Sequence, residues 1–229
     1  MTRIAVYCFE FRASNFYFPL YTIFVDKHTT YTQDKISTLL PNQDYSNCVF
    51  DELDMQNLDL SDCRFTDCSF EKVNLRSTKC NGAVFTRCNF SNANIIGCNF
   101  FSAEFFECKL LGTLLSQASS IIGTEFKKCN FDYADMRALD LSGQDFSNSS
   151  FIESDLSLTN LEKTSFINSQ FINVILNGSK LMMTDLRGAT LQGMSLKQDT
   201  LKGVIITPEQ LQDLARVIGI TILDSDKSK

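Results

Sequence analysis

The sequence predicts an all-β solenoid with four sides and about eight coils, and two periodicities predict it. An apolar residue recurs at every fifth position from Asn47 to Ile206, in blocks such as SDCRF and TDCSF. Phenylalanines also recur at twenty-residue steps, as at Phe65, Phe85 and Phe105. A period of five fits neither a helix nor a flat strand, whereas two inward residues per five describe a short extended segment followed by a corner. Four such blocks per coil give a square cross-section.

This register sorts the inward residues into four columns, two rich in Phe and two mostly aliphatic. The Phe-rich columns contain Phe50, Phe70, Phe90, Leu110, Phe131, Phe151 and Phe171 on one side, and Phe65, Phe85, Phe105, Phe126, Phe146 and Phe166 on another. One aliphatic column runs through Leu60, Cys80, Phe100, Ser120 and Leu141. Stacked rings and aliphatic groups bury apolar surface continuously. At about 4.8 Å per coil, eight coils make a rod of roughly 40 Å.

The chain divides into three parts. Residues 1–35 lack the period and form either a cap over the first coil or a segment without fixed structure, since solenoid ends need covering. Residues 36–206 form the β-helix. The step from Phe105 to Phe126 is 21 residues, so we expect a one-residue register slip near residues 120–122, of the β-bulge kind. Residues 207–229 form the third part.

The third part predicts a short helix, a short strand and a tail. Thr207 suits the N-cap, Pro208 the first helical position and Gln210 the capping box, while Gly219 ends the helix. Apolar residues fall on one helix face and then alternate as in a strand. This part either covers the last coil or joins two copies, and the predicted homodimer interface is Leu211, Leu214, Ala215, Ile218, Ile220 and Ile222.

Composition restricts the function classes. The net charge of −6 and pI near 4.8 argue against direct nucleic-acid binding. Seven of nine cysteines stand two residues before the recurring apolar position, where a small buried residue is required, which predicts free thiols and a cytoplasmic, reducing compartment. We find no secretory signal and no membrane-spanning run. With a single His (His28), no C-x-x-C and no catalytic motif, we expect no metal, no cofactor and no enzyme activity.

Blocks such as TRCNF-SNANI and KKCNF-DYADM resemble those of the pentapeptide-repeat family. The resemblance covers about 160 residues and implies a right-handed quadrilateral β-helix. Residues 120–141 and 201–223 are also similar to the Qnr and MfpA type of this family. That narrower resemblance implies a dimer that is joined by the C-terminal helix. It also implies that the protein binds DNA gyrase and topoisomerase IV and confers quinolone resistance. The chain lacks the two longer loops that many Qnr proteins carry.

Acidic side chains are the candidate binding residues. Between residues 132 and 162 there are seven acids against Arg137 alone. The register places Glu104, Glu125 and Asp145 on one side, with Asp185 two coils further on. It places Asp135 and Asp155 on another side. Carboxylates spaced along a rod can imitate the phosphates of duplex DNA and attract a DNA-binding surface. The alternatives are that the acids only solvate the surface, or that the chain is a scaffold for another protein partner with no topoisomerase role.

Overall fold

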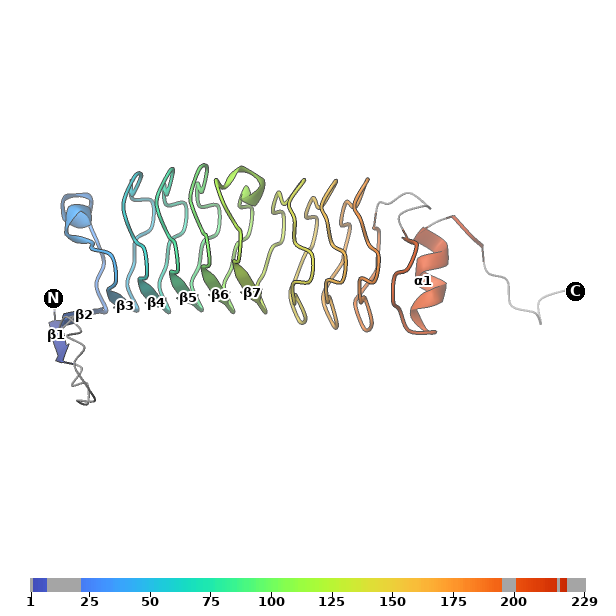
Figure 1. Cartoon of the computed structure of the whole chain (residues 1–229), viewed down its shortest axis with the longest axis horizontal. Coiled ribbons are helices and arrows are strands. Elements are labelled where there is room, and N and C mark those ends of the chain that lie inside the picture. The colour runs from blue at the N-terminus through green and yellow to red at the C-terminus, as the bar shows by residue number, and fades with distance from the viewer. Residues whose placement is uncertain (1, 8–21, 195–200, 218, 222–229) are drawn as a thin grey trace, which may run out of the picture.

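The computed structural model describes residues 2–7, 22–194, 201–217 and 219–221. The chain winds as a rod of stacked coils, with a strand pair at one end and a helix at the other (Figure 1). The strands are β1 (Thr2–Tyr7), β2 (Thr22–Lys27), β3 (Asp44–Ser46), β4 (Arg64–Thr66), β5 (Val84–Thr86), β6 (Glu104–Phe106) and β7 (Glu125–Lys127). The predicted all-β solenoid is confirmed.

The sheet shows how the coils stack. Strands β2 to β7 are parallel neighbours in chain order, and β3 to β6 pair residues twenty apart, as in Phe65 with Phe85. After β7 the same side continues through single bridges between Asp145, Ser165 and Asp185. Three-residue strands of the repeat therefore occupy the five coils β3 to β7, and isolated bridges hold the later coils together. The number of coils that carry a strand is lower than the eight coils predicted.

A left-handed residue makes most of the corners. Asn47, Glu52 and Asn57 have φ of 54°, 58° and 60°, and such residues recur at five-residue steps along the rod. The N–H of Leu53 donates to Phe50 O at 3.3 Å, which closes a turn with its positive φ at the third residue. The N–H of the left-handed residue itself bonds the neighbouring coil, as Glu52 does with Glu71 O at 2.9 Å. The corner thus satisfies its backbone groups.

The core consists of the predicted columns. Rings of one Phe column stack on the next coil, with 5.2 Å between the centroids of Phe65 and Phe85 and 4.7 Å between those of Phe70 and Phe90. Rings of the two columns meet edge to face, as Phe65 and Phe70 do at 79°. Both arrangements suit the aromatic quadrupole. All of these rings are buried.

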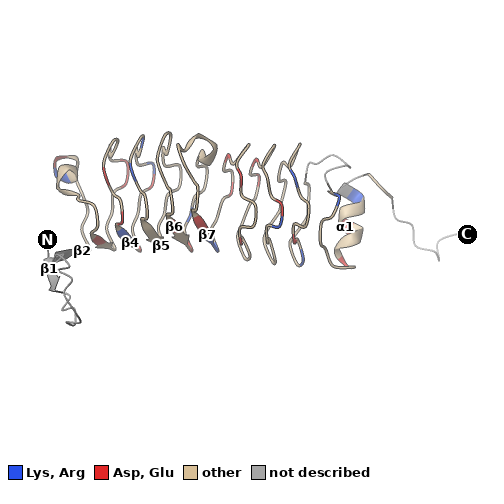
Figure 2. Cartoon of the chain, in the orientation of Figure 1, with Lys and Arg blue, Asp and Glu red and all other residues tan. Residues whose placement is uncertain are grey.

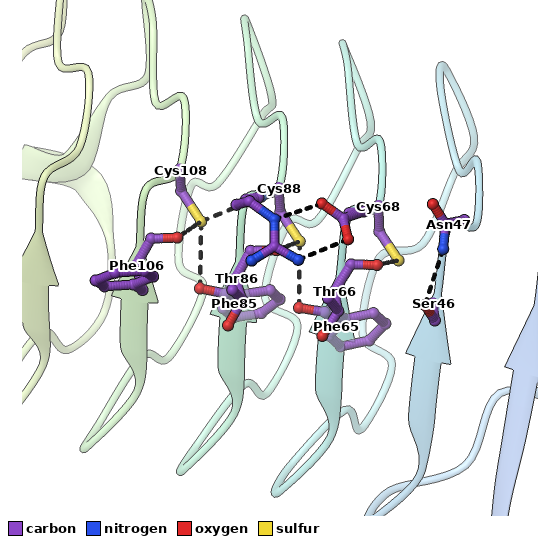
Figure 3. A network of polar contacts seen from close by, with 12 residues as sticks. Ser46, Asn47, Phe65, Thr66, Cys68, Phe85, Thr86, Cys88, Phe106 and Cys108 are labelled. Atoms are coloured by element: carbon purple, nitrogen blue, oxygen red, sulfur yellow. Dashed lines mark hydrogen bonds and ion pairs between the residues drawn. The ribbon is translucent and has the colours of Figure 1, made fainter.

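The cysteines fill the core as predicted. The eight described cysteines are free and buried, and burial raises the pKa of Cys63 to about 11. The Cys88 thiol donates to Phe65 O on the preceding coil at 3.4 Å (Figure 3). In later coils a hydroxyl does the same at the equivalent position, as Thr159 Oγ1 donates to Met136 O at 2.9 Å. The position therefore takes a small or medium-sized buried residue, and a Cys or Thr there can donate to the preceding coil. Cys8 lies outside the described residues.

The register slip lies a few residues before its predicted place and is not a β-bulge. The extra residue is taken up at the 3-10 turn η2 (Leu115–Gln117), where the N–H of Gln117 donates to Leu114 O and that of Ala118 to Leu115 O. These i→i−3 hydrogen bonds tighten the corner so that it absorbs one residue.

This placement corrects one column. The bridges that span η2 join residues 21 apart, including Asn99 with Ser120. Ser120 is therefore a flanking residue, and Ile121 takes the inward position next to Phe100 and packs on the core. The predicted register placed Ser120 in that column because it lies twenty residues after Phe100, and the slip was expected only near residues 120–122.

The N-terminal segment continues the sheet. Strand β1 is antiparallel to β2, and β2 pairs in parallel with β3. The Tyr31 ring stacks on Phe50 at 4.6 Å between centroids, which extends a Phe column by one ring. The 3-10 turn η1 (Gln33–Thr38) follows and buries Ile36. The division between residues 1–35 and 36–206 stays a prediction. Residues 1 and 8–21 lie outside the described chain.

Helix α1 (Gln210–Val217) covers the last coils. Gln210 accepts from the N–H of Thr207 at 2.9 Å, which is the reciprocal half of a capping box, and its Nε2 donates to Leu186 O and Ala189 O. Gly219, with φ of +79°, ends the helix. Gly219, Ile220 and Thr221 form no strand, contrary to the sequence prediction; Ile222 and the tail lie outside the described residues.

Candidate functional site

Two regions of the rod carry most of its acids. We call residues 44–67 the first acidic segment and residues 132–162 the second acidic segment. Each has seven acids and one base. The first contains Asp44, Asp51, Glu52, Asp54, Asp59, Asp62 and Asp67 with Arg64, and the second contains Asp132, Asp135, Asp140, Asp145, Glu153, Asp155 and Glu162 with Arg137. Figure 2 shows the charges distributed along the rod.

In the first acidic segment the next coil supplies counter-charges. The Arg87 guanidinium forms two hydrogen bonds with the Asp67 carboxylate, at 2.6 and 2.7 Å. Lys72 Nζ lies 3.3 Å from Glu52 Oε1. Two further acids have a base stacked on them from the next coil. These pairs are Asp44 with Arg64, and Asp59 with Lys79, whose charged atoms are 4.0 Å apart. Four of the seven acids thus face a base on the next coil.

In the second acidic segment the residues stacked on the acids from the next coil are neutral or acidic. The Asp145 carboxylate accepts from the N–H and hydroxyl of Ser147, at 3.0 and 2.6 Å. Asp140 accepts from the Ser142 N–H and from Nδ2 of Asn160, the residue stacked on it. The pKa of Asp140 is lowered, and the hydrogen bonds from Ser142 are the largest cause. Neutral donors orient these carboxylates and leave their charge in place.

Asp132 shows the same pattern. Its carboxylate accepts from Nδ2 of Asn130, the hydroxyl of Ser150 and the N–H of Ile152, which stacks on it from the next coil. No described residue lying twenty positions after an acid of the second acidic segment is basic. The seven acids surround the rod, because they come from all four sides.

The column of four acids has the spacing that the register placed. Glu104 and Glu125 are paired neighbours on β6 and β7, and Asp185 lies two coils beyond Asp145, with Ser165 between them. Glu125 forms an ion pair with Lys127 at 2.6 Å. Two acids of the column, Glu104 and Asp145, have no ion pair among the described residues.

Three predicted site acids share one form of neutralisation. Asp185 binds Arg187 at 2.7 Å, and Asp135 binds Arg137 at 2.7 Å, in each case across the buried residue between them. The hydrogen bond from the guanidinium lowers the pKa of Asp135 and that of Asp185. The sequence carried this signal as an acid, an apolar residue and a base, in EFK, DMR and DLR.

Asp155 lies next to Asp135 on the following coil, as predicted. Its Oδ2 is 3.8 Å from Nε of Arg137, so the one base of the second acidic segment serves two carboxylates. Asp155 also accepts from the N–H of Ser157 at 2.9 Å. One guanidinium cannot cancel both charges, so this side of the segment stays anionic.

The predicted dimer residues separate into two groups. Leu214 (8% exposed) and Ala215 are buried, and Leu214 belongs to the core cluster, so they seal the last coils. Leu211 (58% exposed) and Ile220 face outward. Ile218 and Ile222 lie outside the described residues.

Within the described chain no three His, Cys, Asp or Glu side chains are grouped so as to hold a metal ion. The helix found there is also too short and too polar to cross a membrane. A shallow groove of about 320 Å³ runs along one edge, lined by polar side chains including Lys109, Lys128 and Asn148. The molecule presents an extended, patterned surface.

Comparisons with known proteins agree with this architecture. The family model of the pentapeptide repeat region matches residues 40–115 and 124–201 of this chain. One trypsin-treated variant of QnrB1, a plasmid-mediated fluoroquinolone resistance protein, is 17% identical with a TM-score of 0.65, over 87% of this chain and 97% of that one. A second such variant is 15% identical with a TM-score of 0.55, over the same shares. No curated protein matches. At these identities the likeness shows the fold.

Proposed function

Because the chain belongs to the pentapeptide-repeat family, we propose that it is a non-enzymatic binding protein whose second acidic segment occupies a DNA-binding surface of a type II topoisomerase, gyrase or topoisomerase IV. The proposal includes protection of that enzyme from quinolones or modulation of its activity. It places the protein in the cytoplasm, where free thiols persist.

The observation that supports this proposal is that no described residue twenty positions after an acid of the second acidic segment is basic. Asp140 and Asp145 are held by serine and asparagine donors, so their carboxylates are ordered by neutral groups and not by a base. A surface that imitates DNA needs this combination, because ordered negative charge steers and registers a basic partner.

The charge density is of the right size. Residues 132–162 wind through about one and a half coils, or about 7 Å of axis at 4.8 Å per coil. Six uncompensated charges over that length give about one per 1.2 Å, close to the one per 1.7 Å of duplex DNA. In both cases the charge surrounds the axis. The segment therefore imitates a short piece of duplex, and its neighbours must supply further contacts.

We propose that two copies join through the C-terminal residues Leu211, Leu214, Ala215, Ile218, Ile220 and Ile222, so that two rods form one longer body. Leu211 and Ile220 are available for this contact, because they are exposed at the end of the rod. Leu214 would act from beneath by holding α1 in place. Leu211→Asp tests the contact without disturbing the buried face, and light scattering would then report half the mass.

The first experiment is a gyrase supercoiling assay with and without a fluoroquinolone, titrated with this protein. We expect restored supercoiling in the presence of the drug. Inhibition without rescue would keep DNA mimicry and reject protection. No effect on gyrase or on topoisomerase IV would reject the topoisomerase proposal as a whole.

The second candidate is a scaffold for another protein partner. The ion pairs of Glu125, Asp135 and Asp185 favour it, because they remove half of the six predicted acids from a DNA-like surface. The lack of long loops favours it as well. It predicts no competition with DNA and a different protein retained in a pull-down.

A further inference from the structure

The middle of the rod carries apolar residues that the repeat does not require. Between residues 95 and 122 the inward residue is accompanied by an apolar neighbour in six places. The inner member of each doublet is buried, or half-buried at Ile121, and the outer member is more exposed. The outer members are Ile96, Phe101, Phe106, Leu111, Leu114 and Ile122. Such positions are mostly polar elsewhere in the repeat, as at Ser61, Asn81, Ser142 and Glu162.

The apolar surface is greatest on one side. Phe101 is 47% exposed and Ile122 is 71% exposed, and they lie on consecutive coils, where the N–H of Ser102 donates to Ile122 O at 2.9 Å. We call this the Phe101 side. Its outward residues flank the column of Leu60, Cys80, Phe100, Ile121 and Leu141. Two large apolar groups on adjacent coils, between the polar residues Asn81 and Ser142 on the coils to either side, indicate a contact site.

We propose that the Phe101 side is an interface between two copies of this chain with their rods antiparallel. The two-fold axis would lie in the interface across the rod, midway between the bridged residues Asn99 and Ser120. That symmetry preserves the strand direction and reverses the rod, so Phe101 of each copy packs on Ile122 of the other. The interface is isologous and closes on itself.

The same symmetry matches the charges. Lys79 pairs with Asn99 from one coil before it, and Asp140 lies one coil beyond Ser120, so the axis puts Lys79 of each copy opposite Asp140 of the other. Lys79 is available, because it reaches its own Asp59 only at 4.0 Å. Among the described residues, Asp140 accepts hydrogen bonds from neutral donors only, Ser142 and Asn160. Two apolar contacts are thus flanked by two opposite-charge contacts.

On other sides of the rod the same antiparallel pairing would bring like charges together. An axis at the same height would put Glu104 opposite Glu125 on the side of Phe106. On the side of Ile96 it would put Arg76 opposite Arg137. If the two rods were parallel on the Phe101 side, Asp140 of one copy would lie opposite Asp140 of the other. Like charges in direct opposition disfavour these arrangements.

The interface spans about four coils of one side, so it is smaller than a standard protein–protein interface. We therefore expect a reversible dimer. Sedimentation equilibrium of the full chain carrying Leu211→Asp isolates this contact from the proposed helix contact. In that background Ile122→Asp should raise the dimer dissociation constant at least about tenfold. Leu158→Asp is the matched control, since Leu158 is 69% exposed at a corner one coil beyond the proposed interface, and it should leave association unchanged.

Charge exchange tests the antiparallel register. Lys79→Glu and Asp140→Lys should each weaken the dimer, and the two together in one chain should restore it, because each copy again opposes unlike charges. Asp140→Asn, which keeps a hydrogen-bond acceptor for Asn160, should weaken the dimer even if Asp140→Lys fails to fold. A monomer at all concentrations, or a dimer indifferent to Ile122→Asp and to both exchanges, would overturn the proposal. The readout is mass, so it is independent of topoisomerase binding.

Discussion

The first and second acidic segments carry equal numbers of carboxylates on one scaffold and differ in what is stacked on them. In the first, Arg64, Lys72, Lys79 and Arg87 stand one coil after an acid. In the second, the corresponding neighbours are neutral or acidic, as in Asp135 with Asp155 and Asp145 with Ser165. In this solenoid a base twenty positions on, or two positions on as at Glu125, Asp135 and Asp185, reduces what an acid contributes to the outer field. Exposed ion pairs add little stability, so the difference concerns binding.

The largest expected effect tests whether the two segments share one scaffold. Phe65→Ala, under the first segment, and Phe146→Ala, under the second, should each lower the free energy of unfolding by about 3–5 kcal/mol, because each ring is buried between stacked rings. Urea unfolding measures both. A much smaller cost at Phe146 would mean that the second segment differs in packing as well as in charge.

The next effect comes from making the first segment resemble the second. Lys72→Gln, Lys79→Gln and Arg87→Gln together remove three counter-charges and leave the acids in place. The variant should bind a lysine-rich peptide more tightly than the wild type, with a steeper dependence on salt, because uncompensated carboxylates are freed. Fluorescence anisotropy measures the affinity. Unchanged binding would show that the stacked bases do not neutralise the first segment.

Salt should separate the two kinds of support. Arg87→Gln should lower Tm by at most about 2 °C at low salt, and by less in 1 M NaCl, since the Asp67 pair is exposed and screened. Ser147→Ala removes a neutral donor from Asp145, so its effect on Tm should change less with salt. Scanning calorimetry at two salt concentrations gives both values. Equal salt dependence would contradict the distinction.

The smallest effect concerns pH. The hydrogen bond from Arg87 lowers the pKa of Asp67 below its unfolded value. The stabilisation it provides is therefore complete above the unfolded pKa and is lost as pH falls through the lowered, folded one. Asp67→Asn should reduce the loss of Tm between pH 7 and pH 2, whereas Ser46→Ala, one coil away, should not. Identical acid sensitivity of both variants would remove Asp67 from this account.

Much of the fold follows from the sequence because one period governs it. The Phe columns, the buried cysteines and the cap of α1 all depend on register, and register can be counted. The slip was misplaced because a 3-10 corner at η2 has no period to count. The strand expected at Ile220 did not form in the described chain, since the Schellman bond from its N–H to Ala215 O ends the helix there.

The binding surface was predictable only in outline. The excess of acids in residues 132–162 is visible in the sequence, but the status of each acid depends on its neighbours. Glu125, Asp135 and Asp185 were chosen by column, although each has a base two residues later. The apolar residues Phe101 and Ile122 were also readable, as the second members of doublets, yet their alignment on one side required the corrected register.

The central claim is that the uncompensated second acidic segment is the binding surface. The direct test adds the missing counter-charges at the stacked positions, with Asn160→Lys, Ser165→Arg and Ile175→Arg together. We would measure displacement of labelled linear DNA from purified gyrase by the wild type, this variant and the Lys72→Gln, Lys79→Gln, Arg87→Gln control. The account predicts displacement by the wild type and the control, and at least about tenfold weaker displacement by the counter-charged variant. Equal displacement by all three, or none by the wild type, would contradict it.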